Sequence, residues 1–291
     1  MIPKQPIVSI IIPTFNRSSY IYKSMENCLN QTYRNIELII VDDGSTDDTF
    51  KIINSFHDDR LRLVRFEKNQ GHIPALNKGF SVATGDFLTW TSDDNSYFPD
   101  AIEQMALELI RHREIDFVYA KNQVIDQNDN ILRELRFEDP DYLDTDNCIG
   151  LCFLYRRKVY VTIGDFNQEA FLAEDYEYWL RVREKFRMKK INTILYSYRI
   201  HEKSLTGIYG EDKVQEMVER VRERFIKPWR KHYFHARKCY ENQNRLEARR
   251  EVFLSLKYNV FYLPTWRLLA LTSLTDPVIY LIRRIKRLFW T

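Results

Sequence analysis

Residues 8–17 read VSIIIPTFNR, a nearly continuous β-branched run that stops at a proline and passes into polar residues. A run without alternation is typical of a strand buried on both faces of a parallel sheet. Similar runs follow at 36–41, 61–66 and 87–91, and each is separated from the next by a segment with helical periodicity. This alternation predicts a parallel, three-layer α/β sheet with right-handed crossovers.

The helical segments have recognisable ends. Ser18 or Ser19 is predicted to cap the first helix, whose apolar residues from Ile21 to Leu29 fall on one face. Proline is favoured in a first helical turn, so Pro99 is predicted to open a helix that runs to His112. Later segments predict a hairpin around 126–130, strands at 117–120, 147–155 and 191–198, and helices at 74–83 and 171–186.

From residue 211 onward every segment has helical character, and residues 240–248 resemble a tetratricopeptide-like helix-turn-helix connection. A chain of 291 residues can bury one large core and carry an appended helical piece. We therefore expect an α/β domain at 1–210 and a helical extension at 211–291.

Charge is divided unevenly between these parts. The extension holds 18 Lys and Arg against 9 Asp and Glu, whereas the remainder holds 26 against 32. A basic tail favours an anionic partner surface. Segment 278–290 is basic and amphipathic but shorter than the roughly 18 apolar residues of a spanning helix. An anionic membrane surface fits it better than nucleic acid, and packing on the protein's own body or on a dimer partner is the alternative.

Two features of the sequence indicate the cellular compartment. The four cysteines lack the density of a disulfide scaffold and are expected to be reduced. The apolar run at 7–12 is too short for a signal-peptide core. We expect a cytoplasmic protein, peripheral at the inner face of the plasma membrane.

Three polar clusters follow predicted strands, at 13–17, 42–45 and 92–95. Open α/β sheets bind ligands outside the carboxyl ends of their strands, so the shared location favours one binding site. Alone, 42–45 is most often a turn and Asp93-Asp94 is often a helix cap. Two adjacent carboxylates beside a buried strand are costly to hold without a cation, and a divalent ion bound to a diphosphate relieves that repulsion.

The nucleotide has to be held without a glycine-rich phosphate loop, because the sequence contains neither a Walker lysine loop nor a dinucleotide fingerprint. A carboxylate such as Asp43 can accept the imide hydrogen of uracil, with an aromatic ring such as Phe15 nearby. The expected donor is therefore a UDP-sugar.

Taken together, these motifs resemble the inverting glycosyltransferases of family 2, which have a Rossmann-like GT-A fold. The resemblance covers about residues 7–206. It is carried by the segments 8–17, 31–33, 37–47, 69–71, 75–79, 83–86, 174–181, 198–201 and 204–206.

The family resemblance implies roles for individual residues. It places Pro13, Thr14, Phe15, Arg17, Asp43 and Asn77 at the nucleotide-sugar. The usual Asp-x-Asp-Asp pattern lacks its leading Asp here, in a variant similar to the spore-coat polysaccharide transferase branch. Asp94 is then the metal ligand and Asp93 contacts the ribose or a metal-bound water. His201 lies in a region that closes over the diphosphate or completes coordination of Mn²⁺ or Mg²⁺.

The resemblance also assigns the catalytic base to Asp175, the second acid of Glu174-Asp175. The chemistry agrees, because an inverting transfer needs one carboxylate to take the proton of the acceptor hydroxyl, while metal and diphosphate accept the leaving-group charge. The alternative is that both acids only complement a helix N-terminus.

The predicted function is transfer of a sugar, with inversion, from a nucleotide-diphosphate donor to a glycan or lipid-linked acceptor in cell-surface polysaccharide synthesis. A nucleotidyltransferase would need a Gly-rich, basic loop after the first strand, which 13–17 is not. A degenerate nucleotide-sugar-binding regulator is the second alternative, and donor hydrolysis would discriminate against it. The sugar, the acceptor and the oligomeric state do not follow from the sequence.

Overall fold

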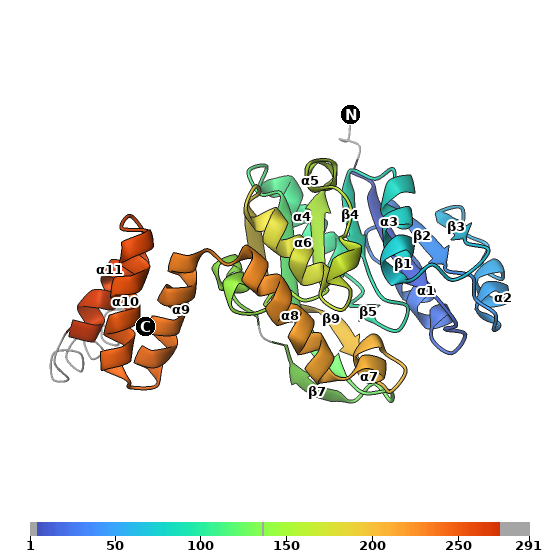
Figure 1. The fold of residues 1–291 in the computed structure, drawn as a ribbon. Helices are drawn as coiled ribbons and strands as arrows, with labels where there is room; N and C mark the ends of the chain where they lie inside the picture. Colours follow the sequence, from blue (N-terminus) through green and yellow to red (C-terminus); the bar gives the residue numbers. More distant parts are fainter. Residues whose placement is uncertain (1–4, 136, 274–291) are drawn as a thin grey trace. The chain divides into compact units, whose positions relative to one another are not determined.

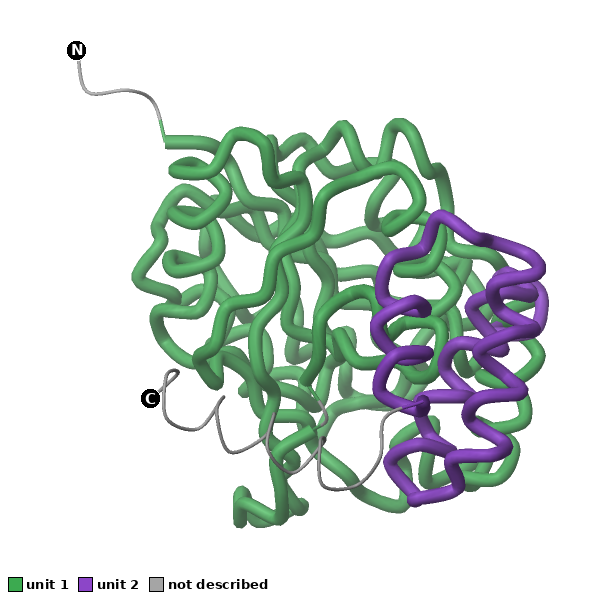
Figure 2. The backbone as a smooth tube through the Cα atoms, turned by 90° about the vertical axis from the view of Figure 1, so that its left-hand side faces the viewer, with its two compact units in different colours: residues 1–221 green, residues 222–291 purple. Residues whose placement is uncertain are grey.

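The computed structural model describes residues 5–135 and 137–273, and the chain divides into two compact units, 1–221 and 222–291 (Figure 2). Helix α8 (Glu211–Phe225) runs across the boundary between them.

Unit 1 is built around a nine-stranded sheet (Figure 1). The strand order is β3-β2-β1-β4-β8-β6-β9-β5, and β7 pairs with β6 away from this path. The strands are β1 (Val8–Thr14), β2 (Ile36–Asp42), β3 (Leu61–Arg65), β4 (Phe87–Trp90), β5 (Ser96–Tyr97), β6 (Phe117–Ile125), β7 (Ile131–Glu134), β8 (Phe153–Arg156) and β9 (Met188–Arg199).

Parallel pairing is confined to part of this sheet. β3, β2, β1 and β4 are all parallel neighbours, as the strand-helix alternation predicts. β8 is antiparallel to both β4 and β6, whereas β6 and β9 are parallel. The α/β class is confirmed, with a mixed rather than fully parallel sheet.

Both faces of β1 are buried, which explains its continuous apolar run. Ile10 and Ile12 pack into a core that includes Met25 of α1 (Ile21–Leu29) and Met105 of α4 (Ala101–Arg111). Ile11 faces the opposite way and meets Gly79 of α3 (His72–Val82) so closely that a Cβ there would clash. The helices of unit 1 are α1 (Ile21–Leu29), α2 (Thr49–Asn54), α3 (His72–Val82), α4 (Ala101–Arg111), α5 (Arg157–Ile163), α6 (Glu174–Arg183) and α7 (Leu205–Tyr209).

Some predicted boundaries are wrong. Helix α1 begins at Ile21 after Tyr20, and no side chain caps its first turn, so neither Ser18 nor Ser19 acts as the expected cap. The strand predicted at 147–155 is β8, only four residues long, and the segment before it is a loop. The helix predicted at 171–186 is shorter as well: α6 spans Glu174–Arg183, and a 3₁₀ turn at Gln168–Ala170 precedes it.

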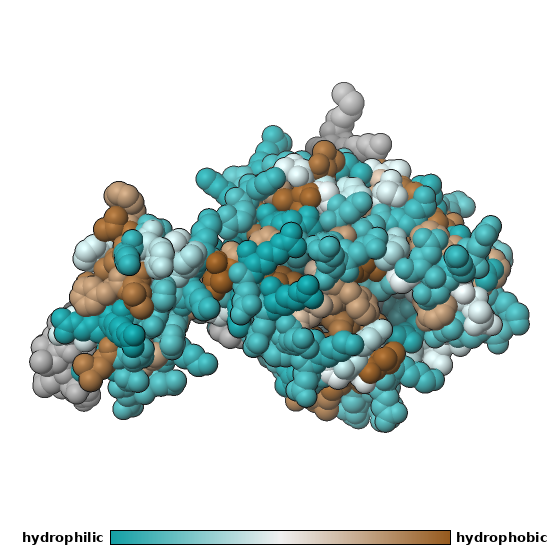
Figure 3. Space-filling model, in the orientation of Figure 1, coloured by the Kyte–Doolittle hydropathy of each residue, from teal (hydrophilic) through white to brown (hydrophobic). Residues whose placement is uncertain are grey.

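Unit 2 is helical, as predicted, and contains α9 (Pro228–Glu241), α10 (Arg245–Tyr258) and α11 (Leu263–Ser273). The predicted connection at 240–248 is confirmed, with Asn244 accepting a hydrogen bond from the Glu247 amide at the start of α10. Ala236, Val252 and Leu268 form its small core. Figure 3 shows a largely hydrophilic face in both units, on which apolar side chains form separate patches.

Among the described helices, none is both long and apolar enough to cross a membrane. The basic amphipathic segment at 278–290 lies outside the described residues.

Candidate active site

A cavity of about 1080 Å³ opens at the carboxyl ends of the parallel strands of unit 1. Parallel strands end on one edge of the sheet, so the loops that follow β1, β2 and β4 meet there. Of the residues predicted for the site, eight line this cavity: Pro13, Thr14, Phe15, Arg17, Asp43, Asp93, Asp94 and Asp175.

The loops after β1 and β2 are tied together by Asn16. Its backbone has a φ of 53°, and its side-chain oxygen accepts hydrogen bonds from the amides of Thr46 and Asp47. The Asn16 amide donates to Ser45 Oγ at 3.0 Å. Gly44 has a φ of 75°, and a Cβ there would approach the Lys68 backbone to 2.8 Å. The Asp-Asp-Gly-Ser turn is therefore shaped by its glycine as well as by its acids.

Asp43 is almost fully buried, at 2 % exposure, and its carboxylate accepts the amide hydrogens of Gln70 at 2.7 Å and Gly71 at 2.8 Å. Burial raises the pKa of Asp43, and those two hydrogen bonds offset only part of the rise. The residue thus joins the end of β2 to the loop before α3 while it lines the cavity.

Asp93 and Asp94 follow β4, and each meets a different basic partner. Arg17 Nε lies 3.3 Å from Asp93 Oδ1, and His201 Nε2 lies 3.0 Å from Asp94 Oδ2. Burial and the neighbouring charge of Asp94 raise the pKa of Asp93 to about 7, although Arg17 opposes this. The charge repulsion between the adjacent carboxylates of Asp93 and Asp94, expected from the sequence, is therefore present in the folded chain.

His201 is fixed from two sides. The ring of Tyr20 stacks on the imidazole with centroids 4.8 Å apart, and Asp94 accepts or donates at Nε2. His201 is not among the residues that line the cavity, so it reaches the site through Asp94. The buried Arg199 holds the same loop, because its Nε donates to the Asp94 carbonyl at 2.9 Å.

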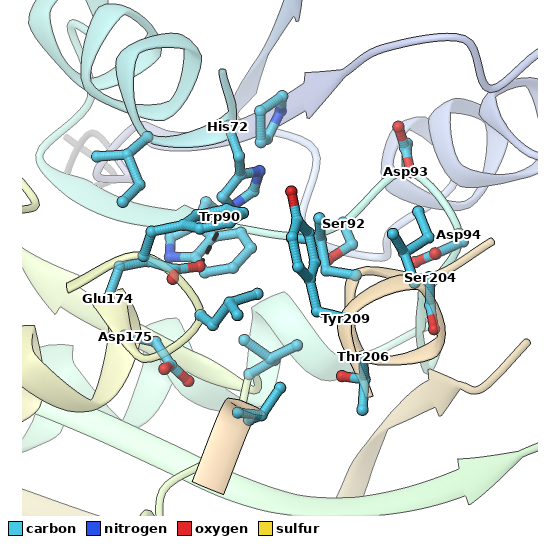
Figure 4. A pocket seen from close by; sticks show the side chains of 18 of the residues that line it. His72, Trp90, Ser92, Asp93, Asp94, Glu174, Asp175, Ser204, Thr206 and Tyr209 are labelled. Carbon is cyan, nitrogen blue, oxygen red and sulfur yellow. Dashed lines mark ion pairs between the residues drawn. The ribbon is translucent and has the colours of Figure 1, made fainter. Parts of the chain in front are cut away.

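Asp175 approaches from the opposite side of the cavity, near the N-terminus of α6 (Figure 4). Asn147 donates a hydrogen bond from Nδ2 to Asp175 Oδ2 at 2.9 Å, which orients the carboxylate. Burial and, to a smaller extent, the adjacent charge of Glu174 raise the pKa of Asp175 to about 6, although the hydrogen bond from Asn147 opposes this rise. An ionised carboxylate with this pKa is a capable proton acceptor near neutral pH.

The rim of the cavity carries aromatic side chains. Phe171 and Tyr209 meet edge to face with centroids 5.3 Å apart, and both line the cavity. Tyr209 closes α7, whose N-cap Ser204 accepts a hydrogen bond from the Gly207 amide. Figure 4 shows Tyr209, Thr206 and Ser204 lying toward the Asp93 and Asp94 side of the pocket.

Asn77 does not line the cavity. Its side chain forms two hydrogen bonds with the backbone of Phe166, one from Nδ2 to the carbonyl and one from the amide to Oδ1, each 2.9 Å long. It therefore joins α3 to the segment before α6. Conversely, His72 and Asn147 line the cavity without having been assigned a role from the sequence, and Glu174, considered there only as a helix-terminal acid, lines it as well.

Comparison with known proteins identifies the family of this chain. The profile of "Glycosyl transferase family 2" matches residues 9–164, more than half of the chain. The chain belongs to glycosyltransferase family 2.

Curated relatives of this family-2 chain include polysaccharide synthases and uncharacterised glycosyltransferases. It is 34% identical over 203 residues to the chondroitin synthase of Escherichia coli, covering 67% of this chain and 29% of that protein. It is 27% identical over 205 residues to the hyaluronan synthase of Pasteurella multocida, covering 69% and 21%. The chain thus spans less than a third of the length of these two synthases.

Solved structures show the fold. The crystal structure of S. aureus TarS 1-349 in complex with UDP-GlcNAc matches with a TM-score of 0.60 at 17% identity, covering 91% of this chain and 71% of that one. The complex of the same protein with UDP matches with a TM-score of 0.57 at 19% identity, covering 74% and 64%. Unit 1 therefore has the GT-A fold expected from the sequence.

Proposed function

We propose that this family-2 chain transfers a sugar, with inversion, from a UDP-sugar to a glycan or lipid-linked acceptor. The observation that carries the proposal is the meeting of Asp43, Asp94 and Asp175 in one cavity, although they are up to 132 positions apart in the chain. Each has the chemistry of a different part of the reaction: base recognition, cation binding and proton abstraction.

The donor is a uracil nucleotide in this proposal. Asp43 accepts two backbone hydrogens and keeps further lone pairs for the imide of uracil, and Phe15 lines the same end of the cavity with 38 % exposure. Pro13, Thr14 and Arg17 extend that wall, and Asp93 lies beside Arg17. The presence of UDP and UDP-GlcNAc in the TarS crystals supports the same assignment.

The residues at Asp94 fit a divalent cation. A carboxylate oxygen and an imidazole nitrogen 3.0 Å apart are suitable ligands for Mn²⁺, and Mg²⁺ accepts the carboxylate with substrate phosphates. The described residues contain no group of three or more His, Cys, Asp or Glu side chains able to hold a metal, so the diphosphate would supply the remaining ligands. When bound, the cation would neutralise the charge of the departing diphosphate.

Asp175 is the proposed base. Its carboxylate takes the proton from the acceptor hydroxyl as that oxygen attacks the anomeric carbon, and the bond from this carbon to the UDP oxygen breaks on the opposite face. Inversion follows from this single displacement. Asn147 orients the carboxylate through its hydrogen bond to Oδ2. The spore-coat-like variant of the acidic motif leaves Asp93 to contact the ribose or a metal-bound water.

The acceptor is proposed to be a polysaccharide or its lipid-linked precursor. Phe171 and Tyr209 provide aromatic surface in the wall of the cavity, which suits the apolar face of a sugar ring. The chondroitin and hyaluronan synthases among the relatives support a polysaccharide product. Cytoplasmic location and membrane-surface binding through 278–290 remain predictions from the sequence.

Thermal stabilisation by a panel of nucleotide sugars tests this function directly. We expect UDP-sugars to raise the melting temperature in the presence of Mn²⁺ and to lose most of that effect with excess chelator or in Asp94→Ala. Equal stabilisation by UDP, GDP and CDP would contradict base recognition by Asp43. Stabilisation without slow donor hydrolysis would favour the degenerate-regulator alternative.

A further inference from the structure

His72 and Glu174 form a pair in the wall of the cavity, in which Glu174 is buried and His72 is half-buried. His72 opens α3, Glu174 opens α6, and their side chains meet with Nε2 3.4 Å from Oε1 (Figure 4). Glu174 is only 7 % exposed. His72 Nε2 and Glu174 Oε2 have no geometrically good hydrogen-bond partner among the described residues. A neutral imidazole beside a buried carboxylate would leave the carboxylate charge poorly compensated, so the contact favours imidazolium and carboxylate.

The surroundings of His72 are acidic on several sides. Glu174 and Asp175 face it from α6, Asp93 from the loop after β4, and Asp43 from the end of β2. Burial lowers the pKa of His72, but the contact and charge of Glu174, helped by Asp93 and Asp175, raise it above the ordinary value. His72 lies at the N-terminus of α3, where the helix dipole disfavours a cation. The acidic neighbours of His72 must therefore outweigh the effect of the helix dipole as well as that of burial.

Glu174, the acidic member of this pair, also acts on Asp175, the proposed base. Its charge raises the pKa of the adjacent Asp175, and Tyr198 faces the same two acids. Trp90 packs edge-on against the His72 ring with centroids 5.7 Å apart. The Trp90 ring thereby helps to hold the His72 ring against Glu174.

We propose that His72 is a positioning residue for Asp175: its imidazolium neutralises Glu174 and so keeps the neighbouring carboxylate ionised as a base. The inference rests on the proposed function of Asp175. The inference adds an electrostatic interaction between two helices. The positive charge of His72, on α3, compensates the negative charge of Glu174 next to Asp175 at the start of α6.

The pH dependence of kcat/KM tests whether His72 acts on Asp175 through Glu174. His72→Gln removes the positive charge, so the acid limb should move up by about one pH unit, the lower end of the shifts caused by a nearby charge. Glu174→Gln removes the like charge, so the limb should move down. The double variant should return the limb to the wild-type position or below. His112→Gln is the matched control, because His112 forms a comparable 3.3 Å pair with Glu108 away from the cavity.

A histidine NMR titration gives a readout independent of turnover. The chain has six histidines, and the spectrum of His72→Gln assigns the His72 signal. We expect the His72 midpoint to fall by about one pH unit or more in Glu174→Gln. An unchanged midpoint overturns the proposal, as does an acid limb that moves equally in His72→Gln and the His112 control. If Asp175→Asn keeps full turnover, the assignment of Asp175 as the base is wrong, whatever the titration midpoint of His72 shows.

Discussion

Asp175 sits where burial and a neighbouring carboxylate make its own carboxylate more basic than usual. Asp175→Asn keeps the size and the contact with Asn147 but removes basicity. We expect turnover to fall by about 10²-fold or more, the usual scale of general-base effects, with UDP affinity nearly unchanged. Single-turnover rates and calorimetric UDP binding measure the two quantities separately. Loss of affinity without loss of turnover would identify Asp175 as a helix-terminal acid only.

The same pKa sets a pH dependence. A general base works only when deprotonated, so activity should be lost as pH falls through the pKa of Asp175, about 6. The pKa of a free aspartate is near 4, so an unperturbed base would keep full activity down to about pH 5. The acid limb of kcat/KM against pH distinguishes these cases. A limb centred near 4 would mean that the burial of Asp175 does not persist in the working enzyme.

Asp43 is predicted to recognise the nucleotide. Removing one partner of a buried hydrogen bond costs about 1–3 kcal/mol, so Asp43→Ala should weaken UDP binding by about 5- to 150-fold. Because Asp43 also holds the Gln70 and Gly71 amides, loss of affinity alone is not specific. The preference for UDP over CDP, measured by calorimetry, should disappear in the variant. A preserved preference would place base recognition elsewhere.

Single residues differ in how well the sequence predicts them. The acids that follow strands were predictable, because the ends of parallel strands meet at one edge. His72 and Asn147 were not, because their roles depend on contacts with Glu174 and Asp175 across 102 and 28 positions. Asn77 carried a family motif, yet its side chain is used to bind the Phe166 backbone. Motif membership therefore does not reveal which way a side chain points.

At the level of elements, β1 to β4 and their helices follow from local pattern, whereas the second half of the sheet does not. The buried run of β1 is recognisable because both its faces are covered. β5 has only two residues and exists through pairing with β9, more than 90 positions away. β8 is short because the preceding loop turns toward Asp175 rather than extending the strand. Such features depend on tertiary contacts that no local window contains.

The packing of α3 on β1 gives a test at this scale. Gly79→Ala would drive a methyl group into Ile11. Overpacking costs about 1–3 kcal/mol, which exceeds the roughly 1 kcal/mol that alanine gains over glycine in a helix. We expect the free energy of unfolding in urea to fall. Lys78→Ala, on the exposed side of the same helix, is the control and should change it by less than about 0.5 kcal/mol. A stabilised Gly79→Ala would show that α3 packs less closely.

At the scale of the whole molecule, the chain combines a GT-A unit with a small helical unit whose core is modest. The proposed chemical residues all lie in unit 1 and precede residue 202. The sequence predicted a helical C-terminal region because strand-helix alternation gives way to helical periodicity along the chain, although the expected change at residue 210 precedes the boundary between the units at residue 221. It could not predict the acceptor, since the surface around Phe171 and Tyr209 is assembled from segments with no shared motif.

The central claim is that this cavity carries out an inverting, cation-dependent transfer from a UDP-sugar. Proton NMR of the sugar released by slow hydrolysis of an α-linked UDP-sugar tests it without knowledge of the acceptor. With Mn²⁺ present, the account predicts that the β-anomer appears first, before mutarotation, and that release stops in Asp94→Ala or excess chelator. Initial release of the α-anomer, or full release in chelator, would contradict it.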